Sequence, residues 1–380
     1  MKKWTLTVLV VFSLWLTAIP SQAASLKEEL TDRSLLQKLL EGQVLLIDPK
    51  LSWESAKFSK KDGYEIADLK ALSFDAGSQQ RPDSRVKILL NSLRVSKKIG
   101  TKTYRLEFGN QMNIRLSSPN KEDATRTDLT NVMIGLTKAV YFYEVPKNAE
   151  LHSTFSADRV DIAVEAAGEK GSTTLFTISL NKLLADGTKY YDLAARPSAI
   201  KSKQSLSVKN VTLAMMEDEF VVIPADGSLK ILVKLFGNAE KYLKAEGTVL
   251  TEKDPQKFMA GLSKWSKDGG KFQIENLEIL GFGSPVNLQV EINFPDGADG
   301  QPLLNGSYIL TINDWDSFMS KLKALRSKNG KVLVSAEFAA VLESLKLSFA
   351  ETEGKKVILK ITNNGTEIKS SKGLISARRP

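Results

Sequence analysis

The feature that most constrains the fold is an alternation of apolar and polar residues that runs through most of the chain after about residue 100. Tyr104, Leu106 and Phe108, for example, alternate with Arg105 and Glu107. This period of two is typical of strands in an antiparallel sheet with one apolar and one solvated face. The pattern recurs in the segments DRVDIAVEA, LFTISL, SLKILVKLF, LQVEINF and KVILKIT. Few strands are the continuous apolar runs of a parallel α/β core, which disfavours a Rossmann or TIM-barrel enzyme.

Four other segments have helical spacing. Ser25 and Glu28 form a capping box at the start of a leucine-rich segment that ends near Gly42. Three later helices are expected over 254–267, over 313–329 and from 335 onward. We therefore predict an α+β fold that is predominantly antiparallel, with one or more long curved β-sheets and a few amphipathic helices packed on one face.

The last two of these helices have clear boundary signals. Asn313 or Asp314 is the expected N-cap of the first, and Asn329-Gly330 its expected end. Ser335 begins the second, whose aligned apolar residues are Phe338, Leu342 and Leu345. A strand, 307–312, is expected directly before the first helix, so one segment changes its period from two to about 3.6.

Two stretches of the C-terminal half resemble each other. GSLKILVKLFGNAEKYLK, which begins at Gly227, aligns with GSYILTINDWDSFMSKLK, which begins at Gly306. Upstream of them, VKNVTL matches IENLEI, and the two copies differ by an insertion of about 13 residues. We interpret this as an internal duplication of a strand-strand-helix unit.

The N-terminal segment predicts export. Lys2 and Lys3 precede the apolar run WTLTVLVVFSLWLTAI and a small-residue exit at Ala23, as in a secretory signal peptide. We expect residues 1–23 to be the signal peptide, residues 24–200 an N-terminal α+β region and residues 201–380 a C-terminal β-rich region. The boundary rests on the loop-like stretch AARPSAIKSKQS. The absence of cysteine favours the periplasm of a Gram-negative bacterium over a eukaryotic secretory route.

Charge narrows the range of partners. The formal net charge is +9, with basic residues dispersed along the chain and without an aromatic strip between them. This pattern disfavours nucleic acid as a partner. Lipid or an anionic membrane surface is the more suitable acidic partner, and another envelope protein is a further alternative.

The run from about 270 to 368 is similar to a known family. Its order is strand, strand, acidic-glycine turn, strand, helix, helix and final strand, carried by FQIENLEILGFGSPVNLQVEINF, by LLNGSYILTINDWDSFMSKL, by FAAVLESL and by GKKVILKITNNGTEI. This part resembles an uncharacterised exported family of alphaproteobacteria, domain of unknown function 2125. Members often carry glycine- and arginine-rich versions of these strands, whereas this chain is rich in lysine and serine. The resemblance implies an envelope location and brings no catalytic residues.

The residues needed for common enzymatic sites are scarce. His152 is the only histidine and there is no cysteine, so catalytic triads, zinc sites of the usual type and haem sites are disfavoured. Asp296 and Asp299 lie in a Pro-Asp-Gly turn and miss the spacing of a calcium loop. We assign no catalytic residue, no cofactor and no metal, and a hydrolase with an unrecognised carboxylate site remains the last alternative.

One helix supplies a candidate ligand site. Phe258, Met259, Leu262 and Trp265 share one side of the segment 254–267, with lysines on its flanks. Such a face can bind lipid or line an apolar groove, or it can simply pack on the sheet. The leading prediction is a non-enzymatic, β-rich envelope scaffold that binds lipid or another apolar ligand along the sheet. The alternative is a structural or assembly factor that binds a protein partner through exposed sheet edges.

Overall fold

A computed structural model describes most of the chain. The described residues are 25–31, 46–78, 85–119, 127–144, 150–168, 171–192, 199–215, 218–238, 261, 263–267, 269–295, 305–326, 330, 332–364 and 366–377. Every strand pairing with a described register is antiparallel, as the alternation predicts. Within these residues, no helix is both long and apolar enough to cross a membrane.

The chain forms two compact units, residues 1–179 (unit 1) and residues 180–380 (unit 2). The division falls inside a long strand, β10 (Gly171–Asp192). The boundary expected from the sequence, between residues 200 and 201, lies within β11 (Ala199–Met215), so the end of the expected loop is extended strand.

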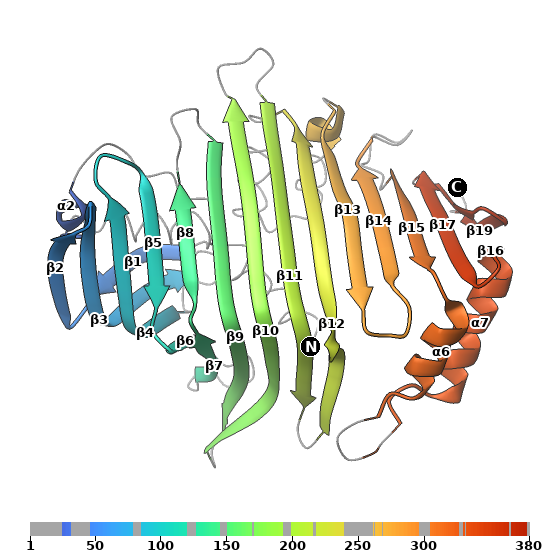
Figure 1. The fold of residues 1–380 in the computed structure, drawn as a ribbon, viewed down its shortest axis with the longest axis horizontal. Helices are drawn as coiled ribbons and strands as arrows, with labels where there is room; N and C mark the ends of the chain where they lie inside the picture. Colours follow the sequence, from blue (N-terminus) through green and yellow to red (C-terminus); the bar gives the residue numbers. More distant parts are fainter. Residues whose placement is uncertain are drawn as a thin grey trace. The chain divides into compact units, whose positions relative to one another are not determined.

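The described residues of unit 1 form one short helix and nine strands apart from β10 (Figure 1). They are α2 (Leu26–Thr31), β1 (Leu46–Ser52), β2 (Ser55–Lys61), β3 (Tyr64–Ser78), β4 (Arg85–Lys98), β5 (Thr103–Phe108), β6 (Gln111–Pro119), β7 (Thr127–Thr137), β8 (Val140–Glu144) and β9 (Glu150–Gly168). The long strands β3, β4 and β9 each pair with two shorter strands along one side: β1 and β2, β5 and β6, and β7 and β8.

The predicted capping box of α2 is confirmed. The backbone N–H of Ser25 donates to the Glu28 carboxylate at 2.8 Å, and the N–H of Glu28 donates to Ser25 Oγ at 3.3 Å. The backbone N–H of Leu26 donates to the carboxylate of Glu65 on β3 at 2.7 Å, which lowers the pKa of Glu65. Residues 32–42 of the predicted helix lie outside the described part of the chain.

The apolar face of unit 1 is mostly buried. Each strand from β3 to β9 has side chains on this face that are at most 8% exposed, as in Leu69, Leu93, Leu106, Ile134 and Ile162, while a few others, such as Phe108 and Phe155, are half-buried. The opposite face carries cross-strand ion pairs, among them Arg94–Asp68 at 2.6 Å and Arg85–Asp75 at 2.7 Å. These pairs place most of the basic segment 85–105 on the solvated face, whereas Lys97 is buried at 5% exposure.

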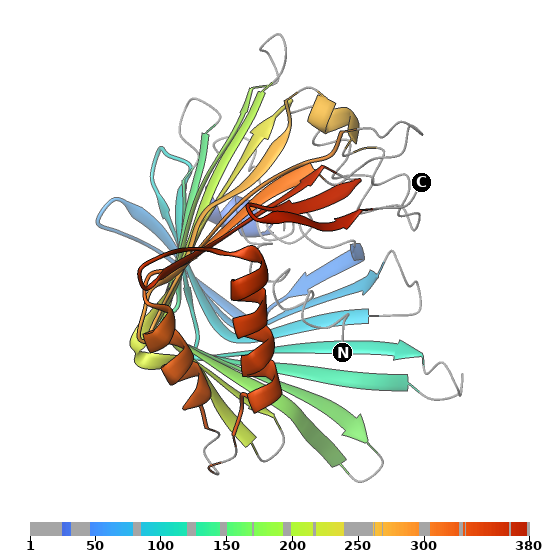
Figure 2. The same ribbon diagram turned by 90° about the vertical axis from the view of Figure 1, so that its right-hand side faces the viewer.

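In its described residues, unit 2 contains the strands that follow β11 and two long helices. They are β12 (Asp218–Gly237), β13 (Lys271–Leu280), β14 (Val286–Asn293), β15 (Asn305–Ile312), α6 (Trp315–Lys323), α7 (Ala336–Phe349), β16 (Glu351–Glu353), β17 (Lys356–Asn364), β18 (Glu367–Ser370) and β19 (Gly373–Ala377). The strands pair in the order β11, β12, β13, β14, β15, β17, and β17 also pairs with β16 and β18. Strand β19 pairs with β18. Figure 2 shows α6 and α7 side by side.

The predicted starts of α6 and α7 are confirmed, and the predicted end of α6 is wrong. Asp314 is the N-cap of α6 and accepts from the N–H of Ser317 at 3.0 Å, and Ser335 caps α7 in the same way. Helix α6 ends at Lys323 instead of near residue 329. The chain turns back there, because Arg326 forms an antiparallel bridge with Val332.

Candidate apolar-ligand site

Unit 2 has a continuous apolar sheet face. The registers of β12 to β15 and β17 place on one side of the sheet, which we call the apolar face, the residues Leu229, Ile231, Val233, Leu235, Phe272, Ile274, Leu277, Ile279, Val286, Leu288, Val290, Ile292, Tyr308, Leu310, Ile312, Val357, Leu359 and Ile361. A register shift in β13, at residues 275–276, keeps its apolar residues on this side against both neighbouring strands. The alternation seen in the sequence therefore produces one dry side, as predicted.

The opposite side of the same strands is mostly polar, although Leu232, Ile309 and Ile358 also lie there. Lys271 Nζ donates to Glu291 Oε1 at 2.8 Å, and Gln273 Nε2 donates to Glu291 Oε2 at 2.6 Å. Hydrogen bonds from Lys271 and then Gln273 hold the pKa of Glu291 below its ordinary value of 4.5. Lys234 and Glu275 form another pair across β12 and β13, at 2.6 Å. This side is adapted to water, which leaves the apolar face as the side that needs a cover.

The cover of the apolar face is incomplete. On this face only Val290, Ile312 and Val357 are buried, at 7%, 3% and 5% exposure, and every other side chain is half-buried. Most described side chains in the equivalent position of unit 1 are buried. The described part of unit 2 thus keeps apolar side chains from five adjacent strands within partial reach of solvent.

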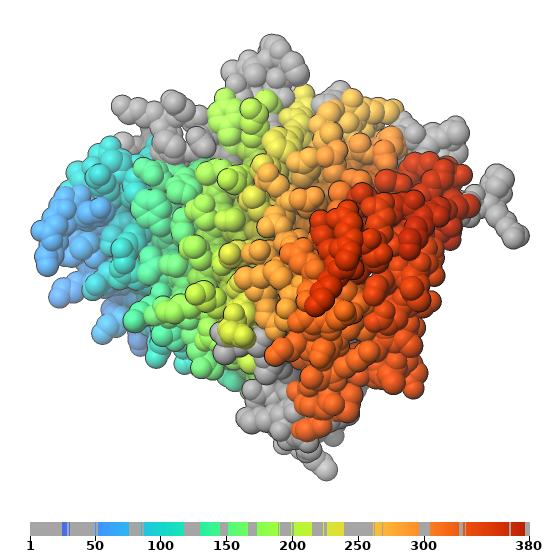
Figure 3. Space-filling view, turned by 45° about the vertical axis from the view of Figure 1, so that its right-hand side comes forward, coloured from blue at the N-terminus to red at the C-terminus, as the bar shows by residue number. Residues whose placement is uncertain are grey.

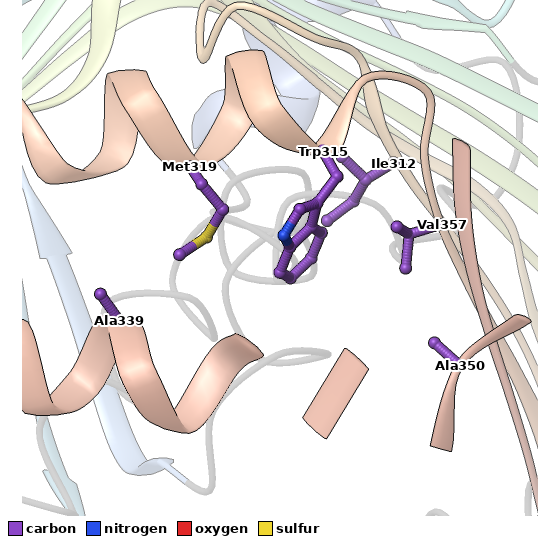
Figure 4. Close-up of a cluster of buried hydrophobic side chains, with 6 residues drawn as sticks. All are labelled: Ile312, Trp315, Met319, Ala339, Ala350 and Val357. Atoms are coloured by element: carbon purple, nitrogen blue, oxygen red, sulfur yellow. The ribbon is translucent and has the colours of Figure 1, made fainter. Parts of the chain in front are cut away.

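Helices α6 and α7 cover one end of the apolar face. Trp315 and Met319 of α6 pack against Ala339 of α7 and against Ile312 and Val357 at the strand ends (Figure 4). The next positions along the strands are only partly included in this cluster. The cover formed by the two helices therefore extends over little more than the first row of the face.

Trp315 is held in place by several contacts. Its indole Nε1 donates to Glu343 Oε1 at 2.9 Å, and its backbone N–H donates to the carbonyl of Lys355 at 3.0 Å. Lys346 Nζ lies 5.1 Å from the centroid of the ring, and Phe318 packs against it with centroids 5.8 Å apart. These contacts fix the position of the Trp315 side chain, which covers this end of the apolar face.

Trp265 closes the other end. It is 1% exposed, and its ring lies where a Cβ on Gly237 or Gly270 would project. Both glycines are two residues from a member of the apolar face, Leu235 or Phe272, and therefore point to the same side of the sheet. The helical residues 263–267 are tied to the end of β14, because Ser266 Oγ accepts from the N–H of Phe294 at 2.9 Å.

Of the four predicted ligand-binding residues, the structure describes one. Trp265 packs on the sheet as stated above, which is the simple packing alternative for this residue. Phe258, Met259 and Leu262 lie outside the described residues, so the prediction that this helical face binds a ligand stays a prediction. The sequence had identified the strand residues as one dry face, but nothing in the alternation shows how much of that face is covered.

Features suited to catalysis are sparse in the described residues. His152 lies on β9 opposite Glu144, and none of the described acidic residues or histidines cluster in a way that could hold a metal ion. A hollow of about 510 Å³ in unit 1 is lined by β2 to β5, where Arg94 already pairs with Asp68. In Asp161, burial raises the pKa, but hydrogen bonds from Arg159 and Ser179 outweigh it and the pKa lies below its ordinary value. These groups are arranged as structural pairs.

Comparisons with protein-family models, with curated proteins and with solved structures found no match to this chain. The resemblance of residues 270–368 to an exported alphaproteobacterial family therefore stays an expectation.

Proposed function

We propose that the protein is an exported, non-enzymatic envelope protein that binds the acyl chains of a lipid on the apolar face of unit 2. The observation that supports this proposal is the half-buried state of that face between its two covered ends. An apolar surface left accessible to water costs free energy, and an apolar ligand recovers that free energy when it binds.

The dimensions of the apolar face suit an acyl chain. Val286 and Ile292 are six residues apart on β14, which corresponds to about 20 Å along a strand. A bilayer core is about 30 Å thick, so the acyl chains of one leaflet extend about 15 Å. Each buried methylene contributes about 0.8 kcal/mol. One acyl chain lying along the strands would therefore fit between Trp315 and Trp265.

The finer predictions about fold and location belong to this proposal. Helices on one face of an α+β fold fit the positions of Trp265 and Trp315, which lie on the same side of the sheet. The signal peptide over residues 1–23 would deliver the chain to the periplasm, where lipids are the available apolar ligands. The internal duplication is less well supported, because β14 lies between β13 and β15 while β11 pairs directly with β12.

The test compares two neighbouring positions of β15. Leu310 lies on the apolar face and Thr311 on the polar side. Leu310→Lys should weaken the binding of a fluorescent fatty acid at least tenfold, since it puts a charge among the methylenes, and Thr311→Lys should leave binding unchanged. Leu310→Trp, which fills the face without a charge, should also reduce binding. Thermal unfolding of each variant reports whether the fold is kept.

Native mass spectrometry of protein isolated from the periplasm is the second measurement. We expect a copurifying lipid that is reduced in Leu310→Trp. Equal fatty-acid binding by Leu310→Lys and Thr311→Lys, together with no copurifying lipid, would refute the proposal. Recovery of one stoichiometric protein after crosslinking in cells would then favour the assembly role.

A further inference from the structure

Helix α7 exposes an apolar stripe on the side that does not pack. Phe338, Val341 and Leu345 are 53%, 52% and 42% exposed. Their spacing of three and four residues places them on one face of the helix. The sequence predicted that Phe338, Leu342 and Leu345 are aligned along the helix, and of these three only Leu342 contacts the cluster around Trp315. We call Phe338, Val341 and Leu345 the α7 stripe.

The stripe is exposed because α7 is apolar on more than one side. Its packed side presents Ala339 and Leu342 to α6, and Lys346 extends over the ring of Trp315. Only one side of the helix can face α6 and the strands, so the remaining apolar residues point to solvent. Figure 3 shows the C-terminal elements, in orange to red, at the molecular surface. A single exposed apolar residue is ordinary, whereas adjacent ones on a helix indicate an interaction surface.

The chain next to the stripe is strongly basic. From Lys321 to Ser335 the sequence contains five basic residues and no acidic one. Lys321, Lys323 and Arg326 are exposed. Arg326 Nη1 donates to the carbonyls of Lys323 and Leu325 at 2.7 and 2.9 Å, which positions its charge at the end of α6.

We infer that the α7 stripe and the basic end of α6 together dock the protein on an anionic phospholipid surface. An apolar helix face combined with nearby cations is the composition of helices that lie in a membrane interface. The apolar side chains enter the headgroup region, and each cation near an anionic surface contributes about 1 kcal/mol. A second copy of the chain is a poorer occupant, because a symmetric contact would bring the two basic segments together.

The test uses two leucines of α7 that differ only in the side of the helix they occupy. Leu345 belongs to the stripe, and Leu347, at 72% exposure, lies about 200° away around the helix. The full chain is sedimented with vesicles of phosphatidylcholine alone or mixed in equal parts with phosphatidylglycerol. Leu345→Asn should weaken binding to the mixed vesicles about tenfold, and Leu347→Asn should leave it unchanged. Both substitutions lower the intrinsic helix propensity by the same amount, so a difference in vesicle binding between the two variants reports contact with the membrane.

The charges are tested in a second set of variants. Lys321→Gln, Lys323→Gln and Arg326→Gln should each weaken binding to the mixed vesicles about fivefold, the change that about 1 kcal/mol produces. Binding to pure phosphatidylcholine should be weaker than to the mixture for the unmodified chain. Equal binding to both vesicle types, equal binding by the two leucine variants, or a dimer that the Leu345→Asn change dissociates would overturn the inference.

The docking surface is independent of the proposed acyl-chain site. Leu310→Lys should lose fatty-acid binding and still sediment with the mixed vesicles. Leu345→Asn should bind fatty acid normally and lose the vesicles. Failure of the acyl-chain proposal and failure of the docking inference can therefore be distinguished in the same set of proteins.

Discussion

Trp265 and Trp315 lie on the same side of the unit 2 sheet and cover opposite ends of its apolar face. The first packs against Gly237 and Gly270 at one end of the strands, and the second packs against Ile312 at the other. Each indole shields the apolar positions nearest to it. Apart from Val290, the side chains between them stay half-buried, and this middle region is where we propose that an acyl chain binds.

Gly270→Ala tests the contact with Trp265. A methyl group at this position would overlap the indole ring, so the ring or the strand end must shift. We expect the free energy of unfolding, measured in urea, to fall by about 1–3 kcal/mol. The control is Gly135→Ala, where the new methyl group would meet nothing closer than 3.6 Å and should raise stability by about 0.5–1 kcal/mol. Equal stability of the two variants would show that Trp265 does not rest on Gly270.

Substitutions of Trp315 and Glu343 test the packing at the other end of the apolar face. Trp315→Ala removes the largest side chain of the cluster and should lower the free energy of unfolding by about 3–5 kcal/mol. Glu343→Ala removes the acceptor of the indole N–H and should cost about 1–3 kcal/mol. Glu343→Gln keeps an acceptor in the same place and should cost less than Glu343→Ala. The order of the three midpoints in urea checks the assignment, and a Glu343→Ala protein as stable as the unmodified chain would contradict it.

Much of the fold could be predicted because its signals are local. Alternation identified Val290 and Ile292, and Val357 and Leu359, as residues of one dry face, and their registers confirm it. The N-caps of α2, α6 and α7 follow from short side chains that accept a backbone N–H, which requires no tertiary contact. In these regions the determining interactions lie within a few residues of the chain, so a sequence pattern is sufficient to predict the structure.

The rest depends on contacts between distant residues. The apolar pattern of α7 fits burial on either side, and it is packing against Trp315 that buries Ala339 and exposes Phe338. The more complete burial of the unit 1 face and the partial exposure of the unit 2 face depend on the surrounding chain. A strand of either unit shows the same alternation. For this reason the candidate site could be predicted as a dry surface, and its accessibility could not.

The alternation also does not predict the backbone conformation of Ala71. It has a φ of 49° in the middle of β3, and the buried side chains change phase there, from Leu69 to Leu72. The left-handed conformation costs a residue with a Cβ about 1–2 kcal/mol, and glycine avoids this cost while losing about 0.5–1 kcal/mol of backbone entropy. Ala71→Gly should therefore stabilise the protein by about 0.5 kcal/mol in thermal or urea unfolding. Ala67→Gly, at a buried position of the same strand, should destabilise it; a loss of stability in both would show that Ala71 is unstrained.

Glu291 makes the stability of unit 2 depend on pH. Because hydrogen bonds from Lys271 and Gln273 hold its folded-state pKa below 4.5, the folded chain binds a proton here less readily than the unfolded chain does. The resulting stabilisation is present above about pH 4.5 and is lost as the pH falls through the folded-state pKa. Glu291→Gln cannot titrate, so its midpoint of thermal unfolding should lie below that of the unmodified chain near neutral pH, and the difference should shrink below about pH 4. Lys271→Met, which removes the donor with the largest effect on this pKa, should reduce the same pH-dependent difference while Glu291 is still present. A gap between Glu291→Gln and the unmodified chain that stays constant from neutral to acidic pH would show that this carboxylate titrates alike in the folded and unfolded chains.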